Sequence, residues 1–415
     1  MSSLLLPEDI ISNILSRLPV KSILRFRCVC KSWCRLFRDP NFIKLHLDRE
    51  TEKENFSLMW DYKNMICSTD YNYEYSSSSL SSVLYNETVN ADCTVDRAIQ
   101  YKFYDDYEKQ MRNRTCDSYF SMDGFKFISS CNGVVCLTAP GLVLLWNPCT
   151  RETRKIPRKR GCIGFGCDSE TGDFKMVELA SINTRKRRGV YSNREDLENN
   201  ILRVYSFESN SWRVIPKIPY KHTSYDIVFF EGAFHWLASP SNGSEDSKQV
   251  LVSFAMLDES FQEVLLPQHL YRYNITSSAT TVAVVGGFLA LIYTVYNIRT
   301  EIWVMKDNGG RNSWTELCIM DLQIICEHPV TRSTFIRSFK NGELLFQKSS
   351  NQDGRHLFLY DPIHGKGRAI DIHSMPPQFT KYYISISSYI RTLASVGSNT
   401  QRKITLRDRT VVCMG

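Results

Sequence analysis

Cysteine and histidine are the residues of this chain whose spacing could most readily reveal chemistry, because both bind metals and both serve catalysis. The sequence contains 14 cysteines, yet no C-x-x-C pair occurs in it. Cys28-x-Cys30 and Cys162-x4-Cys167 lack nearby partners at zinc spacing. The histidines beyond residue 200 are scattered, without the helical pair of a metalloprotease: His222, His235, His269, His328, His356, His364 and His373. We therefore expect no metal site and no cofactor.

Other catalytic patterns are equally weak. Gly164-Phe165-Gly166 lacks a third glycine at dinucleotide spacing and a following helical pattern, so it predicts a turn between strands. The nucleophile motif Gly-x-Ser-x-Gly is absent. Glu170, Asp173 and Glu178 could act as paired acids, but a polar turn and a solvated strand face explain them. His235 lies on a predicted strand and is expected to pack in the core. The sequence therefore predicts a protein that is not an enzyme.

The first stretch of the chain, Leu6 to Leu47, predicts several short helices. Pro7 can open the first helix and Pro19 ends it. The apolar residues between them recur at helical spacing: Ile10, Ile11, Ile14, Leu15 and Leu18. A unit below about 50 residues rarely folds stably without a metal, a disulfide or a partner. Because this stretch has more apolar surface than it can bury, we expect a partner to cover it.

From about residue 125 to 375 the chain repeats itself loosely. A glycine followed by a short apolar strand recurs at 132–137, 231–237, 286–291 and 341–346. A strand, a polar turn and a return strand recur at 144–156, 204–215, 252–266, 302–317 and 357–372. The period of roughly 50 to 60 residues is typical of kelch-like propeller blades. Radial stacking would bury the apolar faces of such small sheets, so we prefer a propeller to a two-sheet sandwich.

The composition is that of a soluble globular protein, with 415 residues, 43% hydrophobic and 23% charged, and a net charge of +7. This mild basicity predicts no nucleic-acid partner. The segment Ile275–Ile298 carries no charge, but Gly286-Gly287 interrupts its apolar run. It therefore predicts two buried strands and no membrane span. The chain start lacks a secretion pattern, so we expect reduced thiols and a cytoplasmic location. Arg185-Lys186-Arg187-Arg188 is either a nuclear import signal or a solvated loop.

These motifs resemble those of plant F-box proteins. The helical stretch matches an F-box at Leu6-Pro7, Leu18-Pro19, Val20–Ser22, Arg25–Trp33 and Asp39–Phe42. The repeats resemble the F-box-associated region at Trp146–Pro148, Gly164–Asp168 with Thr171–Lys175, Asn210–Arg213, His235-Trp236 and Trp303–Lys306. Ala255 departs from the pattern, in which an acidic residue is usual, so its turn is expected to be shaped differently.

The resemblance implies an α+β multidomain protein, a small N-terminal helical F-box followed by an all-β, kelch-like propeller domain. The F-box is expected over 1–47 and the propeller over 125–375. A connecting region over 48–124 could supply the first strands of the β domain or none. C-terminal strands and a basic tail are expected over 376–415.

The resemblance also implies the substrate-recognition subunit of an SCF-type ubiquitin ligase. Such a subunit binds a Skp-type adaptor, and through it a cullin, while the β domain holds an unidentified target protein. The resemblance places the adaptor contact at Leu6, Pro7, Ile10, Ile14, Leu18 and Pro19. Trp33 and Phe37 are expected to hold the helices together.

Three alternatives stay open at this point. Some relatives recognise S-RNases in pollen self-incompatibility and others restrain immune receptors, and the motifs do not choose between these pathways. A propeller enzyme would need inward-facing ligands or carboxylates from several blades. A non-ligase interaction scaffold would use the β domain without ubiquitin transfer.

Overall fold

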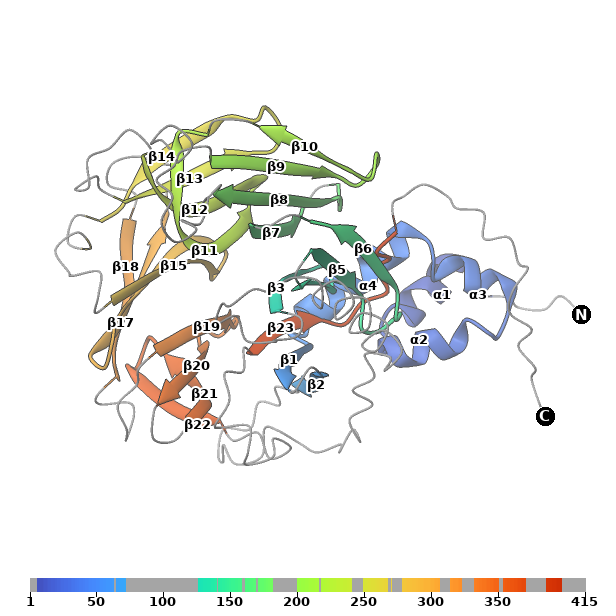
Figure 1. The fold of residues 1–415 in the computed structure, drawn as a ribbon. Coiled ribbons are helices and arrows are strands. Elements are labelled where there is room, and N and C mark those ends of the chain that lie inside the picture. Colours follow the sequence, from blue (N-terminus) through green and yellow to red (C-terminus); the bar gives the residue numbers. More distant parts are fainter. Residues whose placement is uncertain are drawn as a thin grey trace, which may run out of the picture.

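The structure, a computed structural model, describes residues 6–62, 65–71, 126–139, 141–158, 161–168, 171–181, 200–215, 218–240, 249–267, 270, 278–306, 314–322, 332–350, 354–370 and 386–397. Within these residues, N-terminal helices precede a ring of β-sheets (Figure 1). The helices form a unit at one side of the ring, which we call the helical head (residues 6–52). The predicted combination of an F-box-like helical unit and an all-β propeller is confirmed.

The helical head consists of α1 (Glu8–Leu15), α2 (Val20–Phe26), α3 (Lys31–Leu36) and α4 (Pro40–Glu52). Pro7 and Pro19 stand directly before α1 and α2, where a missing backbone N–H costs nothing. Asp39 caps α4 by accepting hydrogen bonds from the backbone N–H groups of Asn41 and Phe42. The boundary expected after residue 47 falls inside α4, which continues to Glu52.

The ring contains five four-stranded antiparallel sheets, which we number as blades in chain order. Blade 1 consists of β3 (Lys126–Cys131), β4 (Val134–Ala139), β5 (Leu142–Trp146) and β6 (Thr153–Pro157). Blade 2 consists of β7 (Cys162–Cys167), β8 (Phe174–Ser181), β9 (Asn200–Ser206) and β10 (Ser211–Ile215). Blade 3 consists of β11 (Tyr220–Phe230), β12 (Ala233–Pro240), β13 (Val250–Ala255) and β14 (Phe261–Leu265).

The last two of these blades have the same order. Blade 4 consists of β15 (Ser278–Val285), β16 (Phe288–Val295), β17 (Arg299–Met305) and β18 (Trp314–Asp321). Blade 5 consists of β19 (Arg332–Ser338), β20 (Leu344–Ser350), β21 (Gly354–Asp361) and β22 (Lys366–Ile370). Each blade is a meander whose first strand faces the neighbouring blades, so the predicted repeats correspond to real blades.

A three-stranded sheet pairs strands from before and after the five blades and closes the ring. It has the order β2 (Met65–Tyr71), β1 (Phe56–Tyr62) and β23 (Ile386–Ile390). β1 pairs antiparallel with β23, with Leu58 opposite Ser388. β23 in turn packs between β19 of blade 5 and β3 of blade 1. The ring therefore draws strands from both sides of the range 125–375 in which repeats were recognised.

Two glycines inside β7 are required by packing between blades, which the sequence alone did not show. Gly164 and Gly166 lie within this first strand of blade 2, not in a turn, so the turn interpretation was wrong. A Cβ atom at either position would collide with side chains of β11, Ile227 at Gly164 and Phe229 at Gly166. The glycines therefore allow blades 2 and 3 to approach closely.

The uncharged stretch near residue 280 forms the strand pair that was expected. β15 and β16 pair antiparallel across Gly286 and Gly287, both of which have positive φ. Among the described residues, the helices are too short and polar to cross a membrane. The basic run Arg185–Arg188 lies outside the described residues.

Candidate functional site: the helical head and its attachment to the propeller

The residues expected to bind an adaptor lie at the free end of the helical head. They are Leu6 and Pro7 before α1, Ile10 and Ile14 on α1, and Leu18 and Pro19 between α1 and α2. Ile10 and Ile14 share one face of α1, Leu6 stands just before the helix, and the three side chains are 45%, 51% and 56% exposed, respectively. We call these three residues the apolar strip. Pro7 and Pro19 are also exposed, whereas Leu18 is half-buried and packs against the core of the head.

Aromatic side chains hold the head together, as expected for Trp33 and Phe37. Phe26, Trp33, Phe37 and Phe42 follow one another with ring centroids 5.8, 6.3 and 5.3 Å apart. Phe37 is fully buried and Trp33 packs beside it. Neither residue belongs to the exposed strip, so these rings stabilise the head from within.

The core of the head continues into the propeller. Cys149, in the turn between β5 and β6, and Leu393, just after β23, belong to the same apolar cluster as Leu15, Ile23 and Phe37. Leu393 is only 2% exposed. Part of the apolar surface for which an external partner is expected is therefore covered within the chain. The propeller of the same chain covers one side of the head, while the apolar strip stays in solvent.

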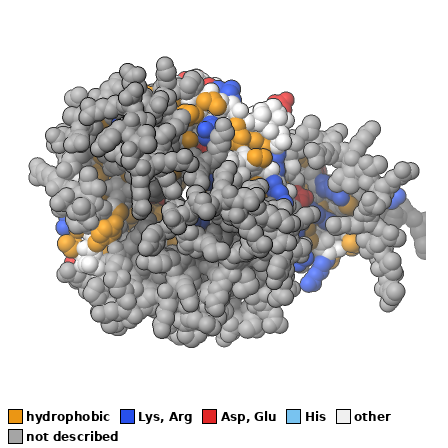
Figure 2. All heavy atoms as spheres, in the orientation of Figure 1, with side chains coloured by type: hydrophobic (Ala, Val, Ile, Leu, Met, Phe, Trp, Pro, Cys, Tyr) orange, Lys and Arg blue, Asp and Glu red, His pale blue; other side chains and the backbone are white. Residues whose placement is uncertain are grey.

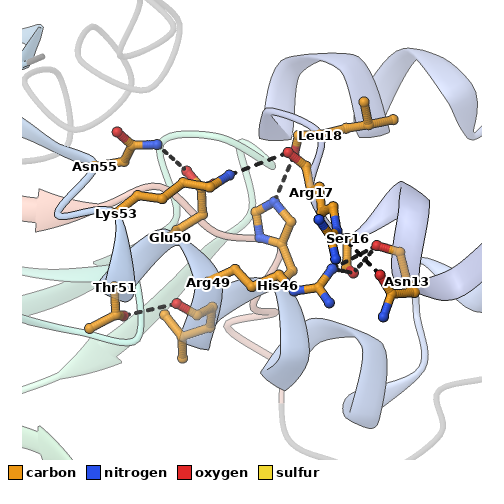
Figure 3. A network of polar contacts seen from close by, with 11 residues as sticks. Asn13, Ser16, Arg17, Leu18, His46, Arg49, Glu50, Thr51, Lys53 and Asn55 are labelled. Carbon is orange, nitrogen blue, oxygen red and sulfur yellow. Dashed lines mark hydrogen bonds and ion pairs between the residues drawn. The ribbon is translucent and has the colours of Figure 1, made fainter.

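Polar contacts fix α1 onto α4 (Figure 3). Arg49 donates through Nη1 to the carbonyl oxygen of Asn13 at 2.7 Å and also to Ser16 Oγ. Lys53 Nζ lies 3.4 Å from the carbonyl oxygen of Arg17. The last carbonyls of a helix lack partners within it and favour cations, so α4 supplies what the end of α1 needs.

His46 makes the most buried contact of this network. Its Nε2 lies 3.0 Å from the carbonyl oxygen of Leu18, which can only accept, so Nε2 carries the hydrogen (Figure 3). Burial lowers the pKa of His46 below its ordinary value of 6.5, so the ring is neutral. Sequence reasoning missed this residue. Its signal was the spacing of Phe42, His46 and Glu50, which share the buried face of α4.

The end of α4 is also tied to blade 5. Lys340, in the turn between β19 and β20, donates its backbone N–H to Glu54 Oε1 at 2.8 Å and its Nζ to the carbonyl oxygen of Glu52 at 3.0 Å. The guanidinium of Arg337 lies 4.7 Å from the ring centre of Phe56, the first residue of β1. The head therefore contacts the propeller near both blade 1 and blade 5.

The segment after β23 holds Leu393 in position. Asn147, from the expected Trp-Asn-Pro motif, donates through Nδ2 to the carbonyl oxygens of Thr392 at 3.2 Å and Ala394 at 2.6 Å. Glu152 accepts hydrogen bonds from the two residues that follow Ala394. The Asn147 side chain also accepts from backbone N–H groups of its own turn. The turn between β5 and β6 is thus closed by Asn147, and the same turn anchors the segment 392–396 that follows β23.

The turn that carries Cys149 recurs between the third and fourth strands of other blades. In each turn a residue of positive φ stands two positions later: Arg151 (61°), Glu259 (59°) and Gly365 (63°). The residues at the position of Cys149 are Leu257 in blade 3 and Ile363 in blade 5, which are 98% and 77% exposed. Because strands alternate in direction, all three turns lie on the face of the ring that holds the head. Two apolar turn tips therefore project into solvent on that face.

The turn after Ala255 is not shaped differently, contrary to expectation. The backbone N–H of Ala255 donates to the carbonyl oxygen of Ser260 at 3.0 Å, as that of Asn147 donates to Glu152 at 3.0 Å. Asp258 takes over the polar role by accepting from the N–H and hydroxyl of Ser260. An acidic residue, Asp258, therefore stands at another position of this turn, and the backbone hydrogen bond that closes the turn is retained.

The residues once considered for catalysis do not come together. Glu178 is fully buried, not solvated, and pairs with Arg203 at 2.7 Å, while Asp173 lies in an exposed turn and Glu170 outside the described residues. His235 is buried between Ser253 Oγ at 2.7 Å and the carbonyl oxygen of Phe230 at 3.2 Å, which fits the expected packing role. Within the described part of the chain, no group of three or more His, Cys, Asp or Glu could hold a metal ion.

Basic side chains are exposed on parts of the head other than α1. Figure 2 shows Lys and Arg at the surface of the head and of the adjoining propeller. The exposed ones on α2, α3 and the loop after α3 are Lys21, Arg25, Lys31, Arg35 and Arg38. The first turn of α1, which carries Ile10, instead bears the exposed acids Glu8 and Asp9.

Comparison with known proteins identifies both parts of the chain. Residues 3–45 match the F-box domain and residues 85–396 match the F-box associated beta propeller domain. Two relatives in Arabidopsis thaliana are F-box protein At3g07870, 27% identical over 90% of this chain and 89% of that protein, and F-box/kelch-repeat protein At3g23880, 25% identical over 75% and 78%. The solved structure of TolB from Acinetobacter baumannii shares 9% identity over 80% of this chain and 66% of that chain, with a TM-score of 0.40 too low to carry an argument. The chain belongs to the F-box proteins that carry an F-box associated beta propeller domain.

Proposed function

We propose that this protein is the substrate-recognition subunit of an SCF-type ubiquitin ligase. Its head would bind a Skp-type adaptor, and through it a cullin, and its propeller would bind a target protein for ubiquitination and degradation. The observation that carries the proposal is the apolar strip of Leu6, Ile10 and Ile14, which stays exposed although Ile11 and Leu15 of the same helix pack into the core of the head. Exposed apolar side chains grouped on one helix face indicate a protein contact.

The attachment of the head supports this role. A substrate receptor makes and breaks no bonds, and acts by holding a target near the ubiquitin carried by another subunit. The effective concentration gained depends on a tether of suitable length and stiffness. Here the head shares an apolar core with the propeller through Cys149 and Leu393 and is hydrogen-bonded to it through Lys340. The proposed receptor would therefore present its target at a fixed position.

The proposal is tested by substitutions that leave the fold intact. Ile10→Asp and Ile14→Asp place charges in the exposed strip, and each is expected to weaken binding of a purified Skp-type adaptor by about 30-fold or more, as loss of an interface anchor does. Leu6→Asp combined with Pro7→Ala should do the same. Ile363→Asp, at an exposed apolar position on a blade turn, serves as the control and should bind normally.

Two results would contradict the proposal. If the strip variants bind the adaptor as tightly as Ile363→Asp does, the contact surface is misassigned. If the unmodified chain retains neither adaptor nor cullin in calorimetry and pull-down, the propeller serves an interaction scaffold and not a ligase. If the adaptor presents an acidic surface to the basic residues of α2 and α3, its association should also slow as salt rises.

A further inference from the structure

Two cysteines meet at the ends of neighbouring inner strands, on the face of the ring that holds the head. β3 of blade 1 and β7 of blade 2 pack side by side. Ser129 Oγ donates to the carbonyl oxygen of Phe165 at 2.9 Å, which sets the level at which the two strands face each other. Side chains two residues apart on a strand point the same way. Cys131 and Cys167, each two residues further on, therefore face each other across the two blades.

The contacts of the two sulfur atoms agree with this register. The Cys131 thiol donates a hydrogen bond to Cys167, which raises the pKa of Cys131 and lowers that of Cys167. Asn132 Nδ2 lies 2.7 Å from the Cys167 sulfur and donates to it as well. The Cys167 sulfur also lies 3.6 Å from the carbonyl oxygen of Asp168, and burial and the Asp168 and Asp173 carboxylates oppose ionisation, but the two donors directed at this sulfur favour its thiolate form. Cys167 is thus the nucleophile of the pair, and Cys131 is the thiol held next to it.

We propose that Cys131 and Cys167 form a redox-active pair that closes to a disulfide between blades 1 and 2 when the protein meets hydrogen peroxide. The Cys167 thiolate attacks the peroxide, forms an S–O bond and breaks the O–O bond, giving a sulfenic acid and, after protonation, water. The Cys131 sulfur then attacks the Cys167 sulfur, and the thiol proton leaves with the hydroxyl as a second water. Two thiols are oxidised and one peroxide is reduced. A small thiol such as dithiothreitol reverses the reaction by exchange.

The buried cysteines Cys136, Cys162 and Cys318 lack this arrangement of donors, whereas the exposed Cys30 of the helical head accepts from the Trp33 N–H at 3.5 Å and lies 3.0 Å from Ser32 Oγ. Burial raises the pKa of Cys162 to about 11 and that of Cys318 to about 12. Cys136, on β4 of the same blade, is fully buried and its pKa is raised further by the same cause. Thiols held protonated in this way react slowly with peroxide. The structure therefore singles out one pair.

The pair lies next to the attachment of the head. The carbonyl oxygen of Asn132, the residue after Cys131, accepts a hydrogen bond from Thr392 Oγ1 at 2.8 Å. Thr392 precedes Leu393, which enters the core of the head. A disulfide formed here would cross-link the ring at the point where blade 1 also holds the chain end.

The test uses the full-length reduced protein, treated with hydrogen peroxide, alkylated, digested without reduction and mapped by mass spectrometry. We expect a cross-linked peptide that contains Cys131 and Cys167 and lacks two hydrogens, with near-complete loss of alkylation at both positions. Dithiothreitol should restore both thiols. The proposal is overturned if both remain alkylated at peroxide doses that oxidise the exposed Cys28 and Cys30, or if the bridges found join other cysteines.

Variants separate the two roles. Cys131→Ser should leave Cys167 oxidised but unbridged, so that a 1,3-diketone probe labels Cys167 as a sulfenic acid. Cys167→Ser should give neither bridge nor label. Cys136→Ser, a nearby buried thiol, is the matched control and should bridge like the unmodified chain. Should a variant fail to fold, the peptide map of the unmodified protein alone decides.

Discussion

The shared core of head and propeller can be tested through Leu393. Leu393→Ala removes a side chain that is 2% exposed and packed among residues of α1, α2 and α3. Such a truncation costs about 2–5 kcal/mol, depending on how well the cavity collapses. The cost falls on the head, because its core loses the contact. Amide hydrogen exchange by mass spectrometry should show protection of α2 and α3 reduced by about 30-fold or more.

A neighbouring residue supplies the control. Val396 lies in the same segment and is 3% exposed, but it packs with Val134 and Phe165 in the propeller. Val396→Ala should therefore lower protection in blades 1 and 2 and spare the head. If Leu393→Ala leaves α2 and α3 as protected as in the unmodified chain, or if both variants change the same peptides, the two parts do not share a core as described.

Three further outcomes follow from single residues. Gly166→Ala adds a Cβ that collides with Phe229, so the free energy of unfolding should fall by about 1–3 kcal/mol. Gly397→Ala is the control, because an added Cβ there meets one side-chain oxygen at 3.4 Å and should change the free energy of unfolding little. Thermal melts compare the two variants. Burial lowers the pKa of His235 to about 4, so its contribution is present above the ordinary pKa of 6.5 and is lost as the pH falls toward 4. Urea titrations from about pH 7.5 to 4.5 should show a loss of about 2–3 kcal/mol that His235→Gln abolishes. Leu257→Ser, at a position 98% exposed, should leave the urea midpoint unchanged, and a fall above about 0.5 kcal/mol would mean that the side chain is covered.

Local signals were enough to predict the helices and the blades. Pro7 and Pro19 stand where the first two helices begin, and the apolar spacing between them matches α1. Three of the four recurring glycine turns are two-residue hairpins, as at Asn132 and Gly133 with φ of 47° and 76°, whereas the turn between β19 and β20 is longer. Such turns depend on a few adjacent residues, which a single sequence shows directly.

Contacts between distant residues were not predictable in the same way. β1 and β23 complete the ring by pairing the two sides of the chain, and neither belongs to the repeat that marks the blades. Gly166 looked like a turn because its cause, the approach of Phe229, lies in another blade. Cys149 and Leu393 carry no mark of packing against the head, since each is an ordinary apolar residue until the fold brings it there.

The order in which the chain is synthesised gives the closing sheet a further consequence. The helices leave the ribosome first, whereas β23 and Leu393, which complete the ring and the core of the head, are made near the end. A nascent or prematurely terminated chain that stops before residue 386 carries all the helices but lacks both contacts. Its head therefore keeps an uncovered apolar side, which chaperones and quality-control proteases recognise. The core of the head is thus completed only after translation has passed Leu393.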